Sequence, residues 1–298
     1  MRKALSRNSF TVNPTPWLLP LALVCLLVFV YPIFQIVRLS FTESTLIETS
    51  NAFSIKSYAS LFRSPDFVSM LAITMIFVGA SVVFQVSLGF AVAMFIDSGS
   101  DRGLKGTMIV RTAVLAAWAL PGVVTGVVWK MMFSEMDSGP LTALVRLLDP
   151  DFRPQFLSSP APALVASIVA NIWRGTAYSM ILIYAGLKTF PRELHEAAII
   201  DRANALQRLF KVTIPVLAPL LLICVLLVTV QTFNTFDLLR AMTGGGPGKS
   251  TEVIALGIYR TIFNDFELGK GAATAMILLT INVAMTWVYF RYIAGTEE

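Results

Sequence analysis

An asparagine, a glycine and a tyrosine follow one another at helical spacing inside an apolar stretch, in the segment Asn171-Ile-Trp-Arg-Gly-Thr-Ala-Tyr178. Residues three or four positions apart share one face of a helix, so Asn171, Gly175 and Tyr178 offer one cavity an amide, an open space and an aromatic hydroxyl. Such a face suits a sugar, which needs paired hydrogen-bond donors and acceptors and a flat apolar surface for its C–H groups. The alternative role of these polar groups is hydrogen bonding between helices.

Arg174 lies in the same apolar stretch. A charge near the middle of a membrane helix is costly, so its guanidinium must face water, a partner or a ligand. A bidentate contact with a phosphate-bearing substrate such as glycerol-3-phosphate is one role, and a structural or gating role is the favoured one. Asp237 and Arg240, one helical turn apart, are expected to pair with each other.

The composition excludes a soluble domain and predicts an all-α membrane protein. The chain has 298 residues, of which 56% are hydrophobic and 14% are charged, and its mean hydropathy is +0.72. A bilayer-spanning helix needs roughly 20 apolar residues. About six such segments are predicted, at 17–37, 68–96, 107–133, 162–187, 214–238 and 272–293. The net charge of +5 does not indicate nucleic-acid binding, because the basic residues sit at helix ends and form no long stripe with aromatic residues.

The distribution of Lys and Arg predicts the orientation in the membrane. Residues 1–16 are expected to form a cytoplasmic N-terminus, and residues 17–298 a single six-helix domain. The basic loop at about 188–213 and the C-terminus are also expected on the cytoplasmic side.

Catalytic and metal sites are not predicted. The spans carry no nucleophile, base and acid set and no metal cluster, and the single histidine, His195, is expected at the loop surface. The two cysteines, Cys25 and Cys224, fall inside predicted spans, where they are expected to be small buried hydrophobic residues.

A glycine-rich segment, Thr243-Gly-Gly-Gly-Pro-Gly-Lys-Ser250, ends like a phosphate-binding P-loop. The motif needs a glycine where Thr243 stands, a strand before it and a helix after it. Here the segment follows a predicted membrane helix on the outer face, so it is expected to form a tight turn. The chain is therefore expected to bind no cofactor, and ATP and Mg²⁺ would be used by a separate partner subunit.

A polar, basic, helix-forming insert extends from Glu196 to Pro215, between two apolar runs. It resembles the Glu-Ala-Ala loop of ATP-binding-cassette (ABC) importer permeases, whose short helix docks into a groove on the ATPase subunit. Arg202 stands where the family has a glycine, at the point where the loop bends. The resemblance assigns ATPase coupling to Glu196, Ala197, Ala198, Asp201, Arg202, Ala203 and Pro215.

Four further motifs together resemble the carbohydrate-uptake branch of these permeases: Phe233-Asn-Thr-Phe-Asp237, Thr243-Gly-Gly-Gly-Pro247, Ser250-Thr-Glu252 and Tyr259-Arg-Thr-Ile-Phe263. The resemblance implies a type I ABC importer permease fold with six transmembrane helices. It also implies a substrate pocket between the fourth and fifth spans, with Gln231 and Asn234 as nearby amides. The predicted substrate-binding residues are Asn171, Arg174, Gly175, Tyr178, Thr232 and Thr235.

The function implied by this resemblance is the permease subunit of an ATP-driven importer of a di- or oligosaccharide in the cytoplasmic (inner) membrane. The expected partners are a second homologous permease, two ATP-binding subunits and an extracytoplasmic solute-binding protein. A glycerol-3-phosphate or polyol importer of the same branch is the alternative. An ion-coupled secondary transporter is a further alternative, but it needs acidic residues in mid-span, and Asp237 is the sole candidate.

Overall fold

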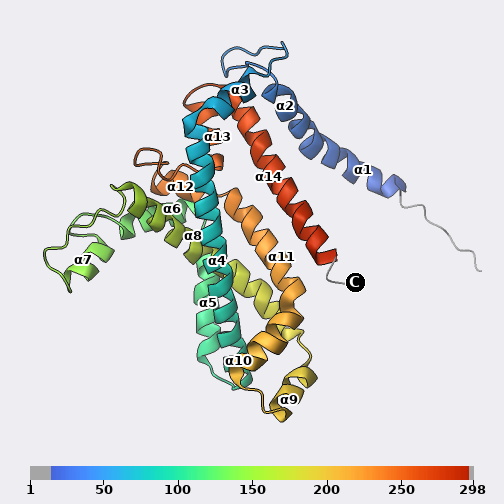
Figure 1. The fold of residues 1–298 in the computed structure, drawn as a ribbon, viewed down its shortest axis with the longest axis vertical. Helices are drawn as coiled ribbons and strands as arrows, with labels where there is room; N and C mark the ends of the chain where they lie inside the picture. Colours follow the sequence, from blue (N-terminus) through green and yellow to red (C-terminus); the bar gives the residue numbers. More distant parts are fainter. Residues whose placement is uncertain (1–14, 295–298) are drawn as a thin grey trace, which may run out of the picture.

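The computed structural model describes residues 15–294, and within this range its regular structure is helical (Figure 1). The predicted all-α class is therefore confirmed. Most of the predicted N-terminal segment 1–16, and the side chain of His195, lie outside the described part. The helices follow in this order: α1 (Thr15–Cys25), the π-helix η1 (Leu26–Val30), α2 (Tyr31–Ser40), α3 (Lys56–Arg63), α4 (Pro65–Asp101), α5 (Gly106–Ala119), α6 (Gly122–Met132), α7 (Pro140–Arg146), α8 (Pro160–Lys188), α9 (Arg192–Ile200), α10 (Ala205–Arg208), the π-helix η2 (Leu209–Thr213), α11 (Ile214–Phe233), α12 (Asp237–Met242), α13 (Ile254–Phe263) and α14 (Leu268–Ala294).

In the described part, four helical stretches are long and apolar enough to cross a membrane: Leu18–Ser40, Pro65–Ser100, Ala205–Phe233 and Leu268–Arg291. A fifth is reached if the bent pair α5 and α6 counts as one span. The predicted span 162–187 coincides with α8. With 29 residues this helix is long enough to cross a membrane, but its several polar residues make it less apolar than the other stretches. The predicted number of six spans is therefore not confirmed.

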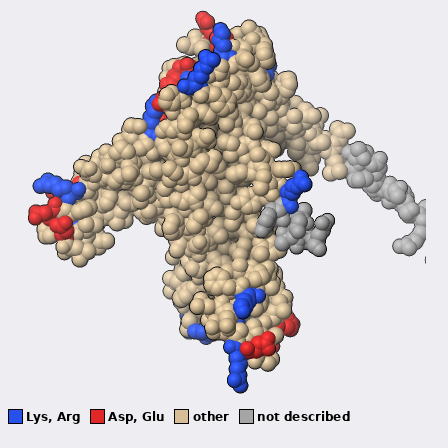
Figure 2. All heavy atoms as spheres, in the orientation of Figure 1, with Lys and Arg blue, Asp and Glu red and all other residues tan. Residues whose placement is uncertain are grey.

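Charged side chains gather at the two ends of the long axis and at the tip around α7, and the surface between them is mostly uncharged (Figure 2). An uncharged band of this kind suits the hydrocarbon layer of a bilayer. The first span contacts α14 through α2, and its α1 end leads away from the other helices in Figure 1. No residue of its apolar window is buried within the chain. Cys25 is consequently exposed, contrary to the prediction, whereas Cys224 is buried.

The helices α4 and α8 form the centre of the fold and pack along each other, and α11 packs against both. Their contact is close at Gly89 of α4, where a Cβ atom would lie 2.5 Å from the Cβ of Ser179. Fully buried side chains fill the space around them, among them Phe77, Ile183 and Phe233. The polar residues of α8 are thus held between two apolar neighbours.

The predicted span 107–133 is broken in the middle, and its halves α5 and α6 meet at an angle of 105°. The residue before a proline is driven out of the helical region, and Leu120, which precedes Pro121, is extended with φ −70° and ψ 133°. The chain then restarts as α6 and packs against α12. A Cβ at Gly126 would lie 2.5 Å from the carbonyl oxygen of Leu238, so this packing requires a glycine.

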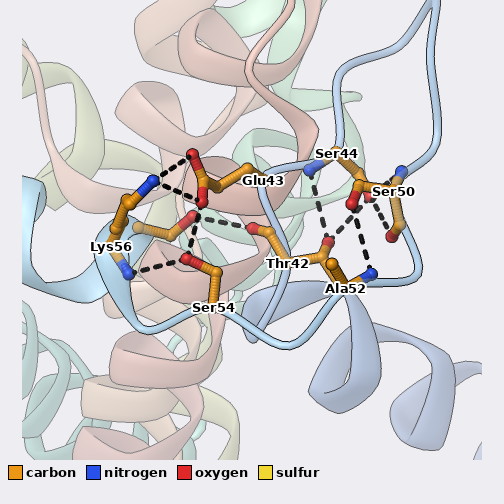
Figure 3. Close-up of polar contacts among 8 residues, drawn as sticks. Thr42, Glu43, Ser44, Ser50, Ala52, Ser54 and Lys56 are labelled. Carbon is orange, nitrogen blue, oxygen red and sulfur yellow. Dashed lines mark hydrogen bonds and ion pairs between the residues drawn. The ribbon is translucent and has the colours of Figure 1, made fainter.

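A polar strap, residues 41–55, joins α2 to α3 and fixes the end of the first span to the start of α14. The backbone N–H of Gly269 donates to the carbonyl of Ser44 over 2.8 Å, and that of Leu46 to Phe266 over 3.0 Å. Within the strap, the hydroxyls of Thr42 and Ser44 lie 2.7 Å apart, as Figure 3 shows. The chain therefore holds its first span at one end only.

Candidate functional site

A cavity of about 430 Å³ opens between α4, α5, α8 and the end of α11. Most of its lining residues are polar, and Trp118 and Phe236 add aromatic surface. The lining residues are Gln85, Trp118, Asn171, Arg174, Gly175, Gln231, Thr232, Asn234, Thr235, Phe236 and Asp237. Five of the six residues that were predicted to bind a substrate thus lie around one space, and Tyr178 does not line it.

Tyr178 packs beside the cavity, with its ring centroid 6.1 Å from that of Trp118. Gly175 was expected to leave an open space for a ligand, but the side-chain amide of Gln85 fills that space. A Cβ at Gly175 would lie 2.3 Å from the amide carbon of Gln85. The Gln85 amide in turn donates from Nε2 to the carbonyl of Asn171 over 2.9 Å. Gly175 therefore positions α4 against α8.

Two buried donors in the cavity wall lack a hydrogen-bond partner among the described residues. They are Nδ2 of Asn171 and Nε of Arg174. A buried donor without a partner costs free energy, and such groups in a native structure point to an absent water or ligand. Both residues line the cavity, so the unpaired donors lie in its wall, although the two atoms are themselves buried.

The remaining polar residues come from α11 and the turn that follows it. The hydroxyl of Thr232 donates to the carbonyl of Val228 over 2.8 Å, and that of Thr235 to Gln231 over 3.3 Å. Each hydroxyl oxygen keeps its capacity to accept a hydrogen bond. Gln231 and Asn234 are exposed to the cavity. They supply amide groups to the cavity. Val228, one turn earlier on α11, is buried in the core and supplies no polar group.

Asp237 does not pair with Arg240, and the prediction was wrong. Its Oδ1 lies 3.7 Å from Nη1 of Arg174, while the guanidinium of Arg240 lies over the ring of Tyr259, 4.9 Å from its centroid. Asp237 is the first residue of α12, and its Oδ1 accepts the backbone N–H of Leu238 over 2.9 Å. A carboxylate is stabilised at a helix N-terminus. At this position Asp237 lines the cavity.

Sequence reasoning missed Gln85 and Trp118. Gln85 interrupts the run Val82-Val-Phe-Gln-Val86, and the argument that singled out Arg174, a polar group inside an apolar span, applies to it as well. Trp118 carries no comparable signal, because aromatic residues are common throughout this chain.

The basic segment, residues 189–213, lies at one end of the molecule and contains α9 (Figure 1). The helix α9 ends in a Schellman motif: the N–H of Ala203 donates to Ala198 over 3.0 Å, and that of Arg202 to Ile199 over 2.9 Å. Such an ending needs a left-handed residue, and Arg202 takes this role with φ 57°. The bend is therefore kept without the glycine.

The faces of α9 differ in their exposure. Ala198 is buried within the chain, whereas Glu196, Ala197 and Asp201 are exposed, as is Pro215 at the start of α11. Large apolar side chains are exposed beside them, with Ile200 80% and Phe210 63% exposed. An apolar surface rimmed by charges at one end of a membrane protein is typical of a docking site for another protein.

The glycine-rich segment forms a loop between α12 and α13, and no strand precedes it in the described part of the chain. Gly244, Gly245 and Gly248 have positive φ, and the hydroxyl of Thr251 donates to the carbonyl of Gly246 over 2.9 Å. Lys249 is paired with Asp66 at the start of α4. The segment thus forms the predicted turn.

Several known proteins are similar to this chain over most of its length. The family described as binding-protein-dependent transport system inner membrane component matches residues 85–295. The trehalose/maltose transport system permease protein MalF of Thermococcus litoralis is 28% identical over 278 residues, 92% of this chain and 91% of that protein. The sn-glycerol-3-phosphate transport system permease protein UgpA of Brucella suis is 28% identical over 278 residues, 93% of this chain and 92% of that protein.

A solved structure has the same fold. It is the crystal structure of a bacterial ABC transporter involved in the import of the acidic polysaccharide alginate. One of its chains superposes with a TM-score of 0.83 at 18% sequence identity, covering 95% of this chain and 96% of that chain. The predicted importer permease fold is therefore confirmed.

The close contact between α6 and Asp237 gives a first prediction. A Cβ at Gly122 would lie 1.8 Å from Oδ2 of Asp237, so Gly122→Ala must displace either α6 or the carboxylate. Overpacking of this kind costs about 1–3 kcal/mol. Thermal denaturation of the purified complex in detergent should show a lower midpoint for Gly122→Ala than for the wild type.

Gly79→Ala is the matched control, because a Cβ at Gly79 of α4 would meet no heavy atom within 4 Å. An alanine in a helix interior is more favourable than a glycine by about 1 kcal/mol, so its midpoint should be unchanged or higher. Equal midpoints for the two variants would show that the approach of α6 to Asp237 does not constrain the cavity.

Proposed function

The chain belongs to the family of inner membrane components of binding-protein-dependent transport systems, and we propose that its cavity carries a sugar across the membrane. The observation that supports the substrate class is the make-up of the cavity wall. Amides from Asn171, Gln231 and Asn234 and hydroxyls from Thr232 and Thr235 surround the indole of Trp118. Sugars need such paired donors and acceptors and stack their C–H faces on aromatic rings.

The chain supplies the membrane pathway, and its partners supply the energy. A second homologous permease completes the channel and covers the apolar surface of the first span. Two ATP-binding subunits bind ATP and Mg²⁺, one docking on the exposed face of α9 and the other on the second permease, so this chain is not itself catalytic. An extracytoplasmic solute-binding protein delivers the sugar at the opposite end, at the side of the strap and the glycine-rich loop.

The basic segment is connected to both helices that form the main wall of the cavity. It follows directly after α8, which carries Asn171 and Arg174, and it leads through η2 into α11, which carries Thr232. The helix α9 also contacts η2. When the ATP-binding subunits close, a displacement of α9 therefore moves α8 and α11 together and reorients the cavity. This is rigid-body gating around one site, with a free-energy change provided by the partner.

The orientation follows from charge. The basic segment is cytoplasmic by the positive-inside rule, and so are the N- and C-termini, with residues 17–298 forming one domain. The segment holds Arg202, Arg208 and Lys211 within a few residues of one another. A carrier coupled to ions is disfavoured, because Asp237 in the cavity is paired with Arg174 and is not a free acid.

Two threonines of the same local structure test the substrate assignment. In the cavity, Thr232 donates to a carbonyl four residues earlier over 2.8 Å, and Thr280 of α14 makes the same bond over 2.7 Å without lining the cavity. Thr232→Ala removes a contact of about 1 kcal/mol and should lower sugar uptake up to tenfold, whereas Thr280→Ala should not. Uptake is measured in vesicles containing the complete importer, together with ATP hydrolysis, which should persist in both variants. Equal uptake by the two variants would contradict the assignment.

The docking role of α9 is tested by a charge on its exposed face. Ala197→Asp leaves the packing of this chain intact but places an unpaired carboxylate against the ATP-binding subunit. A cost of about 2 kcal/mol, roughly thirtyfold in affinity, should reduce co-purification of that subunit. Ala161→Asp at the start of α8, equally an exposed alanine, should leave it unchanged. Normal recovery of the ATP-binding subunit with Ala197→Asp would refute the docking role.

A further inference from the structure

The cavity contains one charge of each sign. Among its lining residues, only Arg174 and Asp237 carry a formal charge. They come from different elements, Arg174 from the middle of α8 and Asp237 from the first position of α12. Their side chains are 28% and 40% exposed, so both are accessible to a ligand. The cavity is therefore polar but has no net charge.

The two charged groups are close but not in direct hydrogen-bond contact. Nη1 of Arg174 and Oδ1 of Asp237 lie 3.7 Å apart, whereas an N–H···O hydrogen bond has a length of about 2.7–3.2 Å. The buried Nε of Arg174 and Nδ2 of Asn171 also have no partner in the described part of the chain.

Two neighbours lie against the carboxylate of Asp237. Its Oδ1 accepts the N–H of Leu238, and its Oδ2 occupies the space that Gly122 leaves free. In this arrangement the carboxylate stands beside Arg174. Any ligand that approaches Arg174 meets this negative charge as well.

A ligand between these groups must both donate and accept hydrogen bonds. A hydroxyl meets both requirements, because its hydrogen donates to the carboxylate and its oxygen accepts from the guanidinium. A phosphate dianion has acceptor oxygens only, so it would satisfy Arg174 but face the Asp237 carboxylate without a shared proton. Repulsive elements of this kind are a general means of specificity.

We propose that Asp237 is a specificity-determining residue that cancels the charge of Arg174, so that the cavity selects an uncharged polyhydroxyl ligand and rejects phosphorylated ones. A ligand hydroxyl lies between Nη1 of Arg174 and the carboxylate of Asp237. This inference rests on the proposed function, that the cavity is the sugar site. It decides between the neutral sugar and glycerol-3-phosphate, both of which the cavity and Arg174 alone would accommodate.

The test is the removal of the negative charge without a change of shape. Binding of trehalose, maltose and glycerol-3-phosphate to the purified complex in detergent is titrated by ligand-observed NMR. The wild type should bind at least one disaccharide more tightly than glycerol-3-phosphate. Asp237→Asn should gain affinity for glycerol-3-phosphate by about tenfold or more, the effect of at least one charge-assisted hydrogen bond, and this gain should diminish at high salt.

Asp265→Asn is the matched control. Asp265 lies 3.7 Å from Nε of Arg260, the same length as the pair in the cavity, but outside the cavity. Its replacement should change neither affinity. The double variant Arg174→Gln/Asp237→Asn is neutral, and it should bind a disaccharide more weakly than the wild type and no glycerol-3-phosphate. The thermal midpoint of each variant shows that the complex is folded.

Two results would overturn the inference: tighter binding of glycerol-3-phosphate than of both disaccharides by the wild type, or no gain of its affinity in Asp237→Asn. The importer function would survive either result, because both concern the charge of the ligand. Failure of the proposed function itself is distinguishable, since Thr232→Ala would then leave uptake of every transported ligand unchanged.

Discussion

The structure depends on the requirement that polar groups inside a bilayer be paired or face a cavity. The central helix α8 breaks this apolar environment with Asn171 and Arg174 near its middle. Two neighbouring helices supply partners for these groups. Gln85 of α4 binds the backbone of α8 at Asn171, and Asp237 of α12 opposes Arg174. The buried donors that remain unpaired belong to Asn171 and Arg174, two residues that line the cavity. The cavity thus lies where the polar side chains of α8 meet their partners on the neighbouring helices.

Close backbone approach is the second condition for this arrangement. Gly175 admits the amide of Gln85, and Gly122 admits the carboxylate of Asp237. The break between α5 and α6 brings Gly122 to that position, because α6 leaves the direction of α5 by 105°. A straight span over residues 107–133 would not place Gly122 where it is. The bend and the glycines therefore shape the cavity together.

The sequence predicts the features that depend on local order along the chain. The basic segment, its short helix α9 and the polar face of α8 follow from charge and helical spacing. Features that depend on contacts between distant segments were missed or wrong. Gln85 meets Gly175 across a separation that no periodicity reveals, and Trp118 reaches the cavity from α5, a separate helix. Asp237 and Arg240 do lie one turn apart in α12, but Asp237 faces Arg174 of α8 and Arg240 lies over the ring of Tyr259. The predicted number of six spans is not confirmed, since four or five stretches are long and apolar enough and the polar residues that build the cavity lower the hydropathy of α8.

The central claim is that this cavity is the sugar site of the importer and is open to water and to the transported sugar. Cysteine labelling tests it most directly. With Cys25 and Cys224 replaced by alanine, single cysteines are introduced at Gln231, exposed in the cavity, and at Val83, 62% exposed on α4. Both are treated with a charged, membrane-impermeant thiol reagent during ATP turnover in reconstituted vesicles. The cysteine at 231 should react and be protected by the transported sugar, while the cysteine at 83, covered by lipid or the second permease, should not react. Equal reactivity of the two positions, or no reaction at 231 at any stage of the ATP cycle, would contradict the account.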